Sequence, residues 1–90
     1  MRVIVLEDQA LLREGIVALL REQGMEVVAT AGDPDDFLLK VDGHKPDVAI
    51  CDVRLPPTFT DEGIRAALEA RRRLPELGVL VLSQYVEPAY

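Results

Sequence analysis

The segment Val3-Ile-Val-Leu-Glu7-Asp8 joins a short apolar run to a pair of acidic residues. Two later runs repeat this design and end in single polar residues: 48–51 before Asp52, and 79–82 before Ser83. Short, continuous runs rich in β-branched residues are typical of strands that are buried on both faces of a parallel sheet. The sequence therefore predicts that these three runs are strands of one parallel sheet.

Helical patterns separate the predicted strands. Gly24 stands where a C-capping glycine belongs, after apolar residues at helical spacing over 12–20. Asp33, followed by Pro34 and two further acids, is a typical helix start. Thr60 is expected to cap a third helix that carries acids in its first turn. Because strands alternate with helices, we predict a right-handed α/β sandwich around a parallel sheet.

The pattern also predicts the strand bounds and the inward-facing residues of each helix. Strands are expected at 3–6, 25–30, 48–51 and 77–82. The residues expected to face the sheet are Leu12, Ile16, Leu19 and Leu20 in the first helix, Phe37, Leu38 and Val41 in the second, and Ile64, Ala67 and Leu68 in the third.

Composition restricts the class of protein. With 90 residues, 49% of them hydrophobic, the chain is expected to form one domain over residues 1–90. A net charge of -6 argues against nucleic-acid binding by this segment, and the arginines at 71–73 are expected to form a solvated helix end. Cys51, the single cysteine, is interpreted as a small buried hydrophobe in a reducing cytoplasm. Because no signal peptide or membrane span is apparent, we expect a cytoplasmic protein without membrane contact.

The polar residues that follow the predicted strands are the candidate site. In open α/β sheets, ligands bind beyond the carboxyl ends of the strands, where Glu7, Asp8, Asp52 and Ser83 are all expected. Because three crowded carboxylates repel one another, the cluster favours a bound cation. The pattern thus predicts a hard metal ion beside a nucleophilic aspartate.

Each of these residues also has a simpler interpretation. Glu7 and Asp8 could begin the first helix, where acids are favoured by the helix dipole. Asp52 could be an ordinary loop aspartate, and Ser83 a strand-end or capping serine. The functional interpretation rests on the convergence of these positions on one geometry.

Three motifs together resemble a known family. Val-Ile-Val-Leu-Glu7-Asp8, Pro46-Asp-Val-Ala-Ile-Cys-Asp52-Val-Arg-Leu-Pro56 and Val-Leu-Val-Leu-Ser83 resemble the receiver domain of bacterial two-component response regulators. The stretch from Pro56 to Gly63 further resembles receivers that are joined to a LuxR-type helix-turn-helix output domain.

The resemblance implies a fold and a set of residue roles. Receivers are flavodoxin-like three-layer sandwiches with strand order 2-1-3-4-5. By analogy, Asp52 would accept a phosphoryl group from a sensor histidine kinase, and Ser83 would contact that group and act as the switch. Glu7, Asp8, Asp52 and the backbone carbonyl of Arg54 would hold Mg²⁺, or Mn²⁺ in its place. Tyr85 and Arg54 would border the site entrance.

The sequence also departs from the family pattern. Glu7 stands where many relatives have aspartate. The chain stops before the fifth strand and its lysine, so the domain is expected to be incomplete at its carboxyl end, with strand order 2-1-3-4. Lys40 and Lys45 lie elsewhere and are not expected to replace that lysine. An uncovered fourth strand would favour self-association, and we expect a homodimer.

Other functions fit the motifs less well. The family implies a phosphoacceptor and no enzyme in the usual sense. An aspartyl-phosphate hydrolase would carry a second aspartate where this chain has Arg54, and a nucleotide-binding protein would have a glycine-rich loop after the first strand. A pseudo-receiver that acts only as an interaction or dimerisation module is the principal alternative.

Overall fold

The central feature of the fold is a parallel sheet with strand order β2-β1-β3-β4. A computed structural model describes residues 1–52 and 61–82 of the chain. The strands are β1 (Arg2–Leu6), β2 (Glu26–Ala31), β3 (Val48–Asp52) and β4 (Gly78–Leu82). This order confirms the predicted parallel, flavodoxin-like arrangement for the described strands. β2 is displaced by one residue from its predicted bounds.

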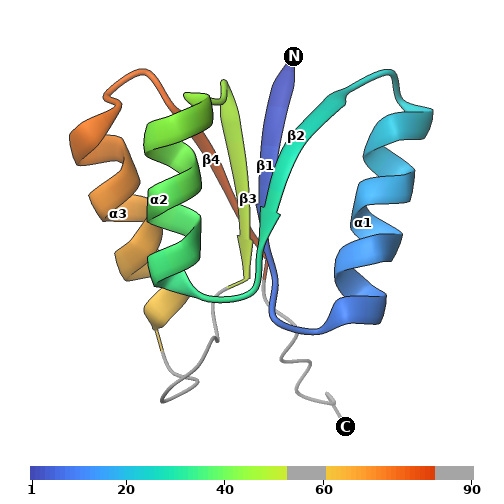
Figure 1. The fold of residues 1–90 in the computed structure, drawn as a ribbon, viewed down its shortest axis with the longest axis horizontal. Helices are drawn as coiled ribbons and strands as arrows, with labels where there is room; N and C mark the ends of the chain where they lie inside the picture. The colour runs from blue at the N-terminus through green and yellow to red at the C-terminus, as the bar shows by residue number, and fades with distance from the viewer. Residues whose placement is uncertain (53–60, 83–90) are drawn as a thin grey trace, which may run out of the picture.

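Three helices cover the two faces of the sheet, as Figure 1 shows. Helix α1 (Ala10–Glu22) lies against one face, and α2 (Pro34–His44) and α3 (Glu62–Arg73) lie against the other. The three layers were predicted, and they are present. Within the described residues, no helix is long and apolar enough to cross a membrane.

Alternation along the central strands supplies both halves of the core. Val3 and Val5 of β1 face α1, whereas Ile4 and Leu6 face α2 and α3. In β3, Ile50 packs on the α1 side of the sheet, and Cys51 packs on the side of α2 and α3. Because both faces of β1 and β3 are buried, these strands read as continuous apolar runs in the sequence.

The C-terminus of α1 is formed by a Schellman motif. The Met25 N–H donates to the Leu20 carbonyl at 3.1 Å, and the Gly24 N–H donates to the Arg21 carbonyl at 3.0 Å. Gly24 has φ +81, the left-handed conformation that glycine adopts without a steric penalty. The predicted C-capping glycine is therefore confirmed.

The prediction of which α1 residues face the sheet is only partly confirmed. Ile16 and Leu20 pack against the core, together with Val17, which was not predicted. Leu12 and Leu19 are 37% and 62% exposed. The helix partly buries a narrow stripe, and leucines to either side of that stripe remain in contact with solvent.

Helix α2 begins and packs as predicted. The Asp33 carboxylate accepts a hydrogen bond of 2.9 Å from the Asp36 N–H, and Pro34 is the first helical residue. Phe37 and Val41 are fully buried, and Leu38 is partly buried against the same cluster. This helix thereby anchors the larger half of the core.

Helix α3 corrects two predictions. It begins at Glu62 with Asp61 at the N-cap position, one residue later than predicted, and Thr60 lies outside the described residues. Ile64 and Leu68 were expected to face the sheet but are 41% and 65% exposed. The buried residues of α3 are instead mainly small, namely Gly63, Ala66, Ala67 and Ala70, together with Glu62. Small side chains let the helix backbone approach the sheet and α2 closely, so the larger residues turn outward.

Apolar side chains of β4 are exposed in the described part of the chain. Leu80, Val81 and Leu82 are 53%, 39% and 36% exposed, although Leu77 just before the strand is buried. β4 pairs with β3 from Gly78 to Leu82. This strand therefore presents an apolar surface that α1, α2 and α3 leave uncovered.

Candidate metal centre

The candidate site lies where β1 and β3 leave the sheet. Leu6 of β1 pairs with Cys51 of β3, so the next residues along the two strands, Glu7 and Asp52, emerge side by side. In Figure 1 these ends lie at the lower edge of the sheet, where α1 and α2 also begin. The carboxyl ends of the strands thus gather the acidic residues at one edge, as predicted.

Three carboxylates meet at this edge. Oxygen atoms of Glu7, Asp8 and Asp52 all lie within 4.8 Å of one another. Glu7 and Asp52 are only 2% and 3% exposed, and Asp8 is intermediate. Buried carboxylates this close together repel when ionised, and a hard cation bound between them removes that repulsion. Their oxygen donors suit Mg²⁺ or Mn²⁺.

The simpler interpretations of these acids do not describe their positions. Helix α1 has Gln9 at its N-cap, so Glu7 and Asp8 both precede the helix. Asp52 is the last residue of β3 and is buried, which is not the environment of an ordinary loop aspartate. The positions of the three acids follow from the ends of the central strands.

The backbone around Glu7 is held by several hydrogen bonds. Its N–H donates to the Ala31 carbonyl at 2.9 Å, and its carboxylate accepts a bond of 3.0 Å from the Gln9 N–H. Its carbonyl accepts a bond of 2.8 Å from Arg13. No sequence pattern signals this contact, because it depends on how the chain turns between β1 and α1.

The remaining predicted site residues lie outside the described part of the chain. Ser83, Arg54 and Tyr85 belong to the segments for which the structure gives no description. The three-carboxylate cluster is therefore the part of the predicted site for which the structure gives a geometry.

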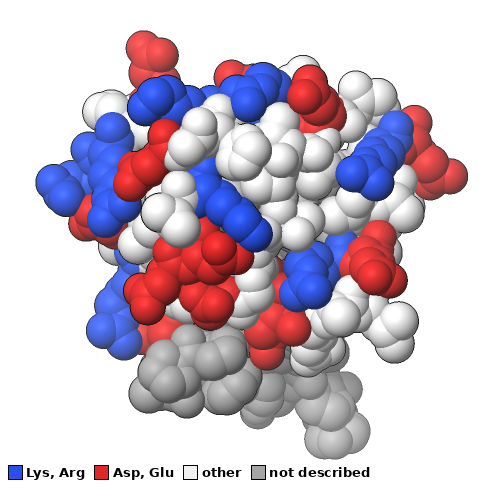
Figure 2. All heavy atoms as spheres, in the orientation of Figure 1, with Lys and Arg blue, Asp and Glu red and all other residues white. Residues whose placement is uncertain are grey.

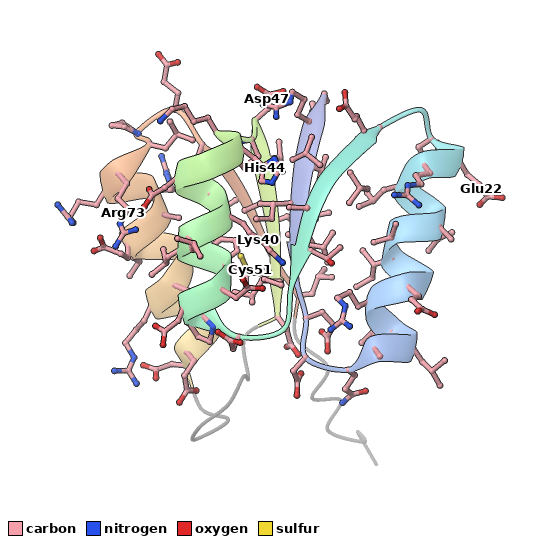
Figure 3. The ribbon with its side chains drawn as sticks, in the orientation of Figure 1. Glu22, Lys40, His44, Asp47, Cys51 and Arg73 are labelled. Atoms are coloured by element: carbon pink, nitrogen blue, oxygen red, sulfur yellow. The ribbon has the colours of Figure 1, made fainter. Side chains whose placement is uncertain are left out.

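Lys40 and Lys45 were not expected to replace the lysine of the fifth strand. Lys40 donates from Nζ to the Thr30 carbonyl at 2.7 Å and forms an ion pair of 2.9 Å with Asp36. Figure 3 shows Lys40 between α2 and the sheet. Lys45 follows α2 at its carboxyl end, with φ 47. His44 and Asp47 lie at the edge of the sheet opposite the acidic cluster, also visible in Figure 3, and His44 is the exposed last residue of α2.

Cys51, beside the site, is part of the core. Its side chain is fully buried, and this burial raises the pKa of its thiol to about 12. A thiol with so high a pKa carries almost no thiolate at neutral pH and is a poor nucleophile. The prediction of a small buried hydrophobe is confirmed.

Surface charge is mixed in sign. Figure 2 shows basic and acidic side chains interspersed on the face that Figure 1 presents, with acids gathered over the lower end of α2. The first turn of α2 carries Asp35 and Asp36. Two of the three arginines in the last turn of α3 contact an acid: Arg72 and Arg73 lie 2.7 and 2.8 Å from Glu69. With a net charge of -6, these features do not form a basic nucleic-acid surface.

Comparison with known proteins agrees with this geometry. The response regulator receiver domain family matches residues 3–90. The oxygen regulatory protein NreC of Staphylococcus haemolyticus is 36% identical over 91 residues, which cover 100% of this chain and 41% of NreC.

Solved structures of response regulators are also similar to this chain. The receiver domain of the response regulator NarL from Mycobacterium tuberculosis has a TM-score of 0.83 and 36% identity, covering 97% of this chain and 68% of that one. A LuxR-family two-component response regulator from Aurantimonas has a TM-score of 0.85 and 26% identity, covering 94% and 59%.

A parallel sheet of this order, with an acidic cluster at its carboxyl edge, places the chain among the doubly wound α/β domains that bind ligands at that edge. The chain belongs to the response regulator receiver domain family of two-component systems. Its similarity to a LuxR-family regulator supports the predicted subfamily. It is therefore a signalling domain and no enzyme in the usual sense, and it spans less than half the length of NreC.

Proposed function

We propose that this chain is the phosphoacceptor domain of a response regulator and that Asp52 receives the phosphoryl group. The observation that carries the proposal is the buried cluster in which Asp52 lies within 4.8 Å of two further carboxylates, Glu7 and Asp8. Asp52 ends a central strand at the edge of the sheet where ligands of this fold bind. The family to which the chain belongs supports the same role.

The proposed reaction is a direct transfer. An oxygen of the Asp52 carboxylate attacks phosphorus of a phosphohistidine on a sensor kinase, and a P–O bond forms while the P–N bond breaks. The imidazole takes up a proton as it leaves. Burial at the strand end holds the Asp52 carboxylate in one position and limits the entry of water.

We further propose that Glu7, Asp8 and Asp52 hold Mg²⁺, or Mn²⁺ in its place, together with the backbone carbonyl of Arg54. When bound, the ion neutralises charge shared between the carboxylates and the phosphoryl oxygens. Ser83 is proposed to contact the phosphoryl group and to act as the switch residue. Arg54 and Ser83 lie outside the described residues, so their roles rest on the family alone.

The partners follow from the same proposal. The phosphoryl donor is proposed to be a sensor histidine kinase that this domain meets in the cytoplasm. Phosphorylation then switches a DNA-binding output domain of the LuxR type in the full protein. Residues 1–90 are proposed to belong to the receiver domain of that protein. The apolar surface of β4 favours a homodimer. Direct binding of nucleic acid by this segment is not part of the proposal, because its net charge is -6.

Labelling by acetyl phosphate tests the role of Asp52. With Mg²⁺ present, the full-length protein should be labelled, and Asp52→Asn should reduce labelling to background because the amide is not a nucleophile. Asp35→Asn, an exposed acid in the first turn of α2, is the matched control and should be labelled normally. Undiminished labelling of a folded Asp52→Asn variant would refute the assignment.

A further inference from the structure

Arg13 links helix α1 to the loop that carries two of the acids. Its Nη1 donates a hydrogen bond of 2.8 Å to the backbone carbonyl of Glu7, six residues earlier in the chain. The bond is partly buried, and it crosses the turn between β1 and α1. A hydrogen bond from a charged donor is stronger than one between neutral groups.

The same guanidinium also lies against the end of β2. A Cβ atom added at Gly32 would lie 3.5 Å from Arg13 Nη1. Gly32 follows the last residue of β2, Ala31, whose carbonyl accepts the Glu7 N–H at 2.9 Å. Arg13 therefore lies where the carboxyl ends of β1 and β2 meet the start of α1.

Holding the Glu7 carbonyl also orients Asp8. A trans peptide is planar, so the N–H of Asp8 must point opposite to the Glu7 carbonyl that Arg13 binds. The Gln9 N–H in turn donates to the Glu7 carboxylate at 3.0 Å. Through these bonds Arg13 restricts the backbone from which both carboxylates project.

The charge of Arg13 has two opposing effects. Its bond to the Glu7 carbonyl places a positive charge near the loop that carries two of the carboxylates. Such a charge reduces the repulsion among ionised acids before a metal binds, but it also repels the bound cation, so the inference rests on the hydrogen bond.

We propose that Arg13 is a positioning residue for the metal centre, one that holds Glu7 and Asp8 in the geometry that binds the ion. The inference rests on the proposed function. Outer partners of this kind commonly change metal affinity without touching the metal.

Helix α1 offers a matched control. Arg21 lies roughly two turns further along α1 and lines the same shallow hollow as Arg13, beside Val17 and Thr30. Removing either arginine changes the net charge equally. Arg13 is the one whose guanidinium binds the Glu7 carbonyl.

Mn²⁺ titration of the full-length protein, followed by electron paramagnetic resonance, tests the inference. Arg13→Gln should weaken Mn²⁺ binding by about tenfold, as typical of lost outer partners of a metal site. Arg21→Gln should change it by less than about twofold, the expected effect of one screened surface charge. Arg13→Lys should bind Mn²⁺ more tightly than Arg13→Gln, because lysine keeps a charged donor. Asp8→Ala removes a proposed metal ligand and gives the affinity expected when a ligand is lost.

Hydrogen exchange of the metal-free protein supplies an independent readout. The Gln9 amide, which donates to the Glu7 carboxylate, should exchange faster in Arg13→Gln and not in Arg21→Gln, with amides of β1 and β3 unchanged. Unchanged Mn²⁺ affinity in Arg13→Gln, or an equal loss in Arg21→Gln, would overturn the inference. Failure of the wild type to bind Mn²⁺ would instead contradict the proposed function, and Gln9 exchange would still decide whether Arg13 holds the loop.

Discussion

At the scale of single residues, neighbouring positions at the end of β3 have opposite chemistry. Cys51 faces the α2–α3 half of the core and is fully buried, whereas Asp52 belongs to the carboxylate cluster. Successive side chains of a strand point to opposite faces, which separates an unreactive thiol from an acid that can bind a metal. The sequence places the two side by side, and the pleat of the strand gives them different environments.

Cys51 should be chemically inert in the folded protein. Burial raises the pKa of its thiol from 9.0 to about 12, so thiolate is scarce and reagent access is blocked. At about pH 8, a disulfide reagent should modify it at least a hundredfold more slowly than in the urea-unfolded chain, a rough estimate from thiolate content and access. Stopped-flow absorbance measures both rates. Comparable rates would show that β3 opens readily or that the thiol is exposed.

At the scale of elements, the C-terminus of helix α1 depends on the left-handed backbone conformation of Gly24. Gly15 and Gly24 both have open space where a Cβ atom would be added, but only Gly24 has a positive φ, +81. The two glycines therefore separate the effect of backbone conformation from that of steric contact. Gly15 lies inside α1, where glycine is a poor helix former.

Replacing each glycine by alanine should have opposite effects. Gly24→Ala should reduce the free energy of unfolding by about 1 kcal/mol, because a Cβ atom disfavours the left-handed conformation. Gly15→Ala should increase it by about 0.5–1 kcal/mol through higher helix propensity. Urea denaturation followed by circular dichroism measures both changes. If Gly15→Ala instead destabilised the protein by about as much as Gly24→Ala, a Cβ atom at position 15 would clash with a neighbouring group.

At the scale of the whole molecule, α2 and α3 are joined on their outer side by charged groups. Arg73 of α3 contacts Asp42 of α2 at 2.8 Å and also Glu69 at 2.8 Å. Hydrogen bonds from Arg72 and Arg73 lower the pKa of Glu69 from 4.5 to about 2. Glu69 lies at the surface, so the stabilising effect is small and is screened by salt.

The lowered pKa determines the direction of the pH dependence. The folded state favours ionised Glu69, so its contribution is full above pH 4.5 and is lost as the pH falls towards about 2. Between these limits the wild type should lose stability more steeply than Glu69→Gln, and the difference should shrink in about 1 M salt. Thermal unfolding across this pH range measures both slopes. Parallel curves at low salt would show that Glu69 is not linked to folding.

The sequence by itself determined the order of elements and the edge at which the site forms. Continuous apolar runs ending in Glu7 and Asp52 predicted buried parallel strands, and ligands of such sheets bind at their carboxyl ends. Local signals also predicted the cap at Asp33 and the glycine at 24, because capping depends on residues within one turn.

Only the tertiary structure decided which helix faces are buried and which side chains support the site. In α3, alanines contact the core while Leu68 is exposed, because the distance between helix and sheet selects small residues over more hydrophobic ones. Arg13 reaches the Glu7 carbonyl because the chain reverses direction between β1 and α1. Helical periodicity records spacing along one element, whereas such contacts depend on the distance and direction between elements, which no local pattern contains.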